Sequence, residues 1–203
     1  MLTQRLRQFT DERLITKTVY TTLQAIGCTL DRSANIQRAR KNFGQRFEDF
    51  AKTILAGLGI ANDSFTFETR VPVINVPYRV PLDIIMNTSG RVYSSPSHID
   101  QRDTIFSIKT SSKDRMKLIF ADRFVLKSVL NVERVNYIAL YLNDVQRSRT
   151  SKINPTFVPD IYLVFCHVLP LYYLDPPAVA ANSRFCGRIK TFDAFMLYDI
   201  WNL

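Results

Sequence analysis

Two kinds of hydrophobic spacing alternate along this 203-residue chain, and the alternation restricts the fold more than any other feature. Residues 43–58 and 113–130 carry apolar side chains at helical spacing, which predicts two amphipathic helices. Other short segments are rich in β-branched and aromatic residues, which favours strands. These segments are 65–74, 78–86, 104–109, 137–142 and 161–168, the last of them expected to be buried on both faces. The order predicts an α/β fold in which helices flank a mixed central sheet.

The segments outside this core are more polar or less regular. Residues 1–30 again show helical spacing, so we expect one or two helices that end at Gly27. We interpret residues 31–41 as a basic connection, 143–159 as a basic polar loop and 192–201 as a closing helix. The predicted organisation is an N-terminal helical segment, 1–35, and a larger body, 36–203, joined in one structural unit.

The charge balance is the first indication of function. The chain has 27 Lys and Arg against 18 Asp and Glu, which gives a net charge of +9, and basic domains often bind nucleic acid or anionic membrane surfaces. The three cysteines include no CxxC pair, which argues against a disulfide framework and against a zinc site. The sequence offers no signal peptide and no apolar run of the length that crosses a membrane, so we expect a soluble, cytoplasmic protein without a membrane partner.

An aspartate within an apolar strand is the residue that most needs a chemical explanation. Asp83 stands in the run VPLDIIM, where a carboxylate is costly to bury unless it is paired or binds a cation. The next strong strand, TIFSIK, ends at Lys109, and alternation places Ser107 and Lys109 on one face. Adjacent strands would bring Asp83 and Lys109 together, forming a hard-cation site with a proton donor or acceptor beside it.

With these residues in place, the stretches PLDIIM and IFSIKTSSKDRMKLIFADRF resemble the PD-(D/E)XK nucleases, and most closely the type II restriction endonucleases. The resemblance covers roughly residues 36–142 and is most specific from Ser107 to Arg115. It implies a restriction-endonuclease-like core and a Mg²⁺-dependent enzyme that hydrolyses double-stranded DNA at a short specific sequence. The part of 36–203 that follows the catalytic core would then hold recognition or dimerisation elements.

The chain departs from the family pattern at two positions. Leu82 separates Pro81 from Asp83, and Ser107 stands where the family usually has an acidic residue. One branch of restriction enzymes resembles this S-x-K arrangement and takes its acid from the following helix, 13 or 14 residues later, which here corresponds to Asp122. A glutamate on the helix before the first strand often faces the active site in this family, and Glu48 matches it.

The resemblance also implies the mechanism. Asp83, Asp122 and the backbone carbonyl of Ile108, with Glu48 as a further ligand, would hold Mg²⁺ at the scissile phosphate. Lys109 would orient or deprotonate the attacking water, and Ser107 completes the predicted catalytic group. Water would displace the 3′ oxygen and leave a 5′ phosphate.

Basic side chains outside this group are the candidates for DNA contacts. They are Lys113 and Arg115 near a helix N-terminus, Arg38 and Arg40 in the N-terminal region, and Arg147 and Arg149 in the basic loop. Cutting both strands of a palindromic site with one active site per subunit favours a homodimer. A cognate DNA methyltransferase in the same system is a further candidate partner.

Three other functions stay open on the sequence alone. One is a nicking or small cleavage subunit of a heterodimeric restriction enzyme, and another is a repair or junction nuclease of the same fold. The third is a non-catalytic DNA-binding protein on the same fold, which the serine at position 107 favours. Asp83 could instead be a structural carboxylate paired with an arginine, and Asp122 could belong to a solvated helix face.

Overall fold

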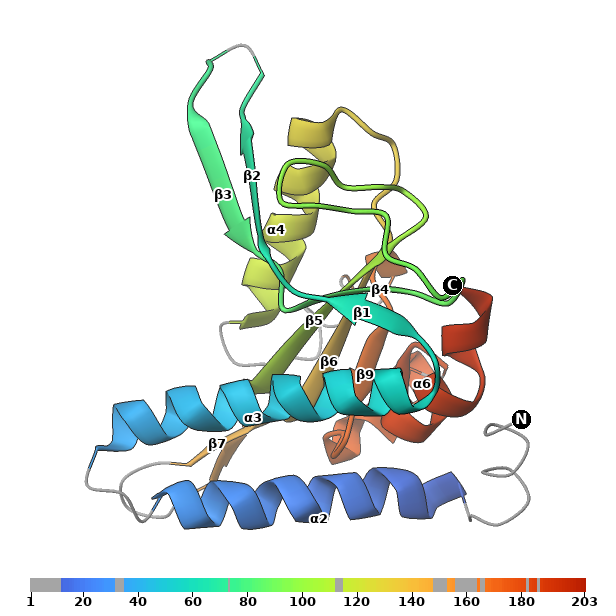
Figure 1. Cartoon of the computed structure of the whole chain (residues 1–203). Coiled ribbons are helices and arrows are strands. Elements are labelled where there is room, and N and C mark those ends of the chain that lie inside the picture. The colour runs from blue at the N-terminus through green and yellow to red at the C-terminus, as the bar shows by residue number, and fades with distance from the viewer. Residues whose placement is uncertain are drawn as a thin grey trace.

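The computed structural model describes residues 12–31, 35–72, 74–111, 115–147, 153–155, 164, 167–181, 183–185 and 187–203. Its centre is a six-stranded mixed sheet with the order β1-β4-β5-β6-β9-β10 (Figure 1). Strands β1, β4 and β5 pair antiparallel, whereas β5, β6, β9 and β10 run parallel. The strand bounds are β1 Ala61–Asp63, β4 Ile84–Asn87, β5 Thr104–Ser111, β6 Tyr137–Asn143, β9 Leu171–Tyr173 and β10 Ile189–Thr191.

Helices cover both faces of this sheet, as an α/β fold requires (Figure 1). Helices α2 (Glu12–Asp31) and α3 (Ile36–Gly57) lie side by side against one face, together with α6 (Phe192–Leu197). Helix α4 (Arg115–Leu130) covers the other face and connects the parallel strands β5 and β6. Three short 3₁₀ helices follow β9: η1 (Ala178–Ala181), η2 (Ser183–Phe185) and η3 (Asp199–Asn202).

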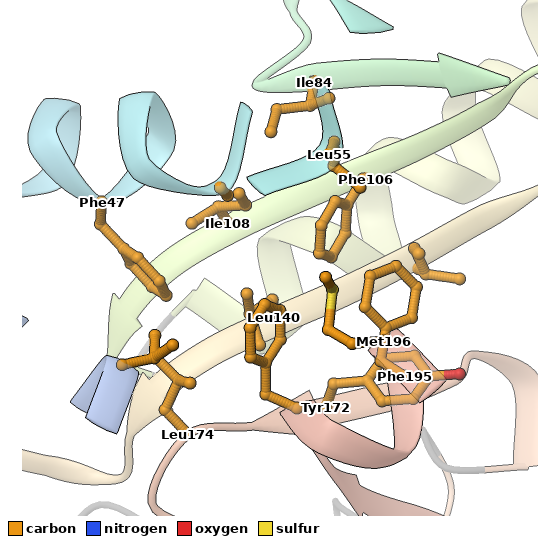
Figure 2. Packing of buried hydrophobic residues seen from close by; sticks show 14 of the residues in the cluster. Phe47, Leu55, Ile84, Phe106, Ile108, Leu140, Tyr172, Leu174, Phe195 and Met196 are labelled. Atoms are coloured by element: carbon orange, nitrogen blue, oxygen red, sulfur yellow. The ribbon is translucent and has the colours of Figure 1, made fainter. Parts of the chain in front are cut away.

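The side chains of β5 alternate between these two layers, as the sequence predicted. Phe106 and Ile108 pack with Phe47 of α3 (Figure 2), whereas Ile105 packs with Ile119 of α4 on the opposite face. This period of two follows from the pleat of the strand. It places Ser107 and Lys109, the polar residues of β5, on the α4 side.

The segment 78–86, expected as one strand, is two strands in two different sheets. Strand β3 (Pro77–Pro81) pairs with β2 (Thr66–Arg70) in a hairpin that projects beside α4, and β4 then enters the central sheet (Figure 1). Leu82 is buried and its N–H donates to the carbonyl of Phe65. Pro81 has no N–H to donate to a neighbouring strand of a central sheet, so it belongs to the hairpin, and the chain joins the central sheet only from Ile84. Asp83 therefore lies at a junction rather than inside a strand.

The N-terminal helices differ from the prediction at their ends. Helix α2 continues through Gly27, where a Cβ would lie 3.3 Å from the ring of Phe43, so that glycine allows α2 and α3 to pack closely. Helix α3 begins at Ile36, not after a connection that reaches residue 41, because the Asn35 side chain caps it by accepting from the Arg38 N–H at 3.0 Å. Residues 1–11 lie outside the described part of the chain.

The predicted strand at 161–168 is wrong. The positions described in that range, Val164 and His167–Val168, are helical and exposed. The buried apolar strand is instead β9, which begins directly after Pro170. The basic loop at 143–159 contains a second hairpin, formed by β7 (Val145–Arg147) and β8 (Ile153–Pro155). No helix in the ranges given above is long and apolar enough to cross a membrane.

Candidate active site

One oxygen of Asp83 accepts hydrogen bonds from three donors on β5. Ser107 Oγ and the backbone N–H of Ile108 both lie 2.9 Å from Asp83 Oδ2. Lys109 Nζ also donates to this oxygen and forms an ion pair with it. The pair is largely shielded, since the side chains are 14% exposed for Asp83 and 24% for Lys109. The juxtaposition expected from the sequence is therefore present, and the partner of Asp83 is a lysine rather than an arginine.

The antiparallel register of β4 and β5 explains why the site forms here. Strand β4 begins at Ile84, which pairs with Phe106, so the residues of β5 beyond Phe106 have no β4 partner on that edge. Asp83 occupies this edge instead. A residue in a strand directs its N–H and its carbonyl to the same side. Because the Ile108 N–H faces Asp83, the Ile108 carbonyl faces the same open edge, as its predicted role requires.

Asp122 on α4 approaches this centre from the α4 side of the sheet. Burial raises the pKa of Asp122; the positive charge of Lys109 opposes that rise and the negative charge of Asp83 adds to it. The pKa of Tyr137 at the start of β6 is also raised, first by burial and then by the charge of Asp122, while a hydrogen bond with Ser107 opposes the rise. Asp122 thus shares an electrostatic environment with Asp83 and Lys109.

Glu48 on α3 approaches from the opposite face. Burial raises the pKa of Glu48, the charge of Asp83 raises it further, and Lys109 opposes both. The charges of Asp83 and Lys109 act on Glu48 from the other side of the sheet because β5 has no β4 partner beyond Phe106. Asp83 therefore contacts Lys109 directly, whereas Glu48 and Asp122 interact with this pair through their charges.

The donor set suits Mg²⁺ better than a transition metal. Among the described residues, no three His, Cys, Asp or Glu side chains stand close enough together to hold a metal ion between them. Magnesium, however, is commonly held by one or two carboxylates with water completing its shell. In the same part of the chain, hydrogen bonds reach Asp83 only at Oδ2, so Oδ1 is available as a ligand. Burial is the first cause of the raised pKa values of Glu48 and Asp122, so both carboxyl groups are partly shielded from solvent.

The predicted DNA contacts fall on elements around this centre. Arg38 and Arg40 are exposed on the first turns of α3, which also carries Glu48. Arg115 is exposed at the start of α4, seven residues before Asp122 and so two turns away on nearly the same face. Arg147 belongs to β7. Lys113 and Arg149 lie outside the described residues.

Sequence reasoning missed two tyrosines near the carboxylates. The pKa of Tyr78 on β3 is raised by burial and then by the charge of Asp122, and Tyr137 hydrogen bonds with Ser107. Tyr137 pairs in register with Ile105, two residues before Ser107. The parallel pairing of 104–109 with 137–142 was the signal that could have placed Tyr137 beside Ser107.

Comparison with known proteins supports the fold. No protein-family profile matches the sequence, and no curated protein matches it either. The structure is similar to the crystal structure of the type IIP restriction endonuclease Kpn2I, with a TM-score of 0.62 and 19% sequence identity. The match covers 95% of this chain and 64% of that chain, so this chain spans just under two thirds of its length. At this identity the likeness establishes a restriction-endonuclease-like fold, which confirms the predicted fold class.

Proposed function

We propose that this protein is a Mg²⁺-dependent type II restriction endonuclease that hydrolyses phosphodiester bonds in double-stranded DNA at a short specific sequence. The observation that carries the proposal is the convergence of Ser107, Ile108 and Lys109 on one oxygen of Asp83 at an open sheet edge. The likeness in fold to a restriction endonuclease supports the same reading. Residues 36–203 would carry this activity, with the later elements serving recognition or dimerisation.

Each residue of the centre has a distinct task in this proposal. Asp83, Asp122, Glu48 and the Ile108 carbonyl are the candidate Mg²⁺ ligands. When bound, the ion would polarise the phosphoryl oxygen and acidify a water molecule. Ser107 and the Ile108 N–H fix the Asp83 carboxylate in one orientation. Lys109 orients the attacking water and places a positive charge beside the phosphate, where negative charge develops in the transition state.

The DNA-binding surface and the oligomeric state are part of the same proposal. The net charge of +9 favours a polyanionic partner, and phosphate contacts from Arg38, Arg40 and Arg115 would supply affinity without sequence choice. One centre in each subunit would require a homodimer to cut both strands of a palindromic site. Lys113, Arg147 and Arg149 stay candidates for DNA contacts, and a cognate methyltransferase for the protection of host DNA.

A non-catalytic DNA-binding protein on this fold is the second candidate, because Ser107 offers a hydroxyl where the family has a carboxylate. Incubation of the purified protein with unmethylated plasmid and phage DNA, in Mg²⁺ and in EDTA, separates the two. We expect discrete Mg²⁺-dependent fragments whose sequenced ends share one motif. Nicked circles alone would indicate a subunit that needs a partner. Salt-sensitive binding without any cleavage would contradict the nuclease and support the second candidate.

A further inference from the structure

A glycine in the middle of α3 has no explanation within the described structure. Glycine in a helix interior costs roughly 1 kcal/mol relative to alanine, so it usually serves close packing, an unusual backbone angle or close approach of a ligand. Gly27 of α2 serves packing, since a Cβ there would lie 3.3 Å from the Phe43 ring. At Gly44, by contrast, no heavy atom of the described chain lies within 4 Å of an added Cβ, and the backbone φ is not positive.

The position of Gly44 connects it to the candidate active site. Arg40, Gly44 and Glu48 follow one another at intervals of four residues and so form one row along α3. At a rise of 1.5 Å per residue the row is about 12 Å long. It begins at the exposed Arg40 and ends at the half-buried Glu48, whose neighbour Phe47 packs with Ile108 of β5, the residue whose N–H donates to Asp83. Gly44 leaves bare helix backbone between the cation and the carboxylate.

The charge of this half of α3 indicates what approaches it. From Ile36 to Arg46 the helix carries four basic residues, Arg38, Arg40, Lys41 and Arg46, and no acidic residue. Of these, Arg46 forms an exposed ion pair with Asp49 at 3.6 Å. A sugar–phosphate strand is a polyanion that basic side chains attract, and it needs space where it approaches the helix backbone. Such a strand fits along α3 between its basic residues and the Asp83–Lys109 centre.

We propose that the Arg40–Gly44–Glu48 row is the track on which the strand to be cut lies. Arg40 contacts a phosphate that flanks the scissile one, and the missing side chain at Gly44 lets the strand approach the helix closely enough for the scissile phosphate to reach Asp83 and Lys109. This inference rests on the proposed nuclease function and adds to it the helix face and the residue that position the substrate.

The substitution Gly44→Ala tests the track because it moves stability and DNA binding in opposite directions. Alanine is the better helix former, so the melting temperature in EDTA should rise by about 2–4 °C. The added methyl group should hold the strand away from the helix and weaken binding to a fluorescent DNA duplex about tenfold, the effect of one lost charge-assisted contact. Cleavage in Mg²⁺ should fall at least as much. Arg40→Gln should reduce the slope of log affinity against log salt by about 1.

Gly57→Ala is the matched control. Gly57 ends the same helix, also has an ordinary φ and no described heavy atom within 4 Å of an added Cβ, and lies on the side of Glu48 away from Arg40. We expect DNA binding by this variant to equal that of the wild type. Wild-type binding by Gly44→Ala, an equal loss in both variants, or a lower melting temperature for Gly44→Ala would each overturn the track. If the unaltered protein neither binds nor cuts DNA, the proposed function itself fails.

Discussion

The triple hydrogen bond at Asp83 predicts how two substitutions at this residue differ in stability. In Asp83→Ala the Ile108 N–H and the Ser107 hydroxyl lose their acceptor, and an unsatisfied buried group costs about 1–3 kcal/mol. Lys109 is partly exposed and can rehydrate, so its lost ion pair adds little. The total loss in the free energy of unfolding is about 3 kcal/mol. In Asp83→Asn the amide oxygen still accepts from both neutral donors, and we expect a loss of about 1 kcal/mol.

The difference of about 2 kcal/mol corresponds to about 4–8 °C in melting temperature for a chain of this size. Urea and thermal unfolding in EDTA measure it, and Asp63→Ala, at an exposed acid on β1, serves as the control with a change within about 0.5 kcal/mol. Both Asp83 variants should be inactive in cleavage. Equal stability of Asp83→Ala and Asp83→Asn would refute the reasoning, because the three donors would then not depend on Asp83 Oδ2.

Two further substitutions separate positioning from charge at the same centre. Ser107→Ala should lower the free energy of unfolding by about 1–2 kcal/mol and slow cleavage about tenfold without abolishing it, since Asp83 keeps two donors. Complete loss of cleavage in single-turnover assays would contradict a purely positioning role for Ser107. Glu48→Gln should raise the melting temperature in EDTA at pH 7, because a raised carboxyl pKa means that the folded state disfavours the charged form. This gain should vanish as the pH falls below the ordinary pKa range of glutamate, and Asp49→Asn, which removes the exposed ion pair with Arg46, should show no gain.

The sequence predicted the parts of the site that depend on local pattern. Period-two alternation in 104–109 assigned Ser107 and Lys109 to one face, and the apolar neighbours of Asp83 marked it as a residue in need of a partner. Both are consequences of the strand pleat and of the cost of burying a charge. The helical spacing of 43–58 likewise led to the helix that carries Glu48.

The features that depend on pairing between distant segments could not be read in this way. The run 78–86 is apolar apart from Arg79 and Asp83, and only the pairing of β3 with β2 and of β4 with β5 shows that it divides at Asp83. The apolar run 161–168 satisfies the pattern of a buried strand and of a helix equally well, which is why that prediction was wrong. The spacing between Lys109 and Asp122 predicted that Asp122 lies on the following helix. It could not predict that Asp122 approaches Asp83, because that depends on how α4 packs against β5.

The most direct test of the central claim compares cleavage with binding in Lys109→Ala and in Lys117→Ala, a substitution of an exposed lysine on α4. Plasmid cleavage is measured in Mg²⁺, duplex binding is measured in EDTA, and circular dichroism verifies the fold. If Lys109 acts on the scissile phosphate and the attacking water, Lys109→Ala should lose cleavage by at least about 10²-fold while keeping its affinity for DNA within a few fold, and Lys117→Ala should cut normally. Normal cleavage by Lys109→Ala would show that the Asp83–Lys109 centre is not the active site.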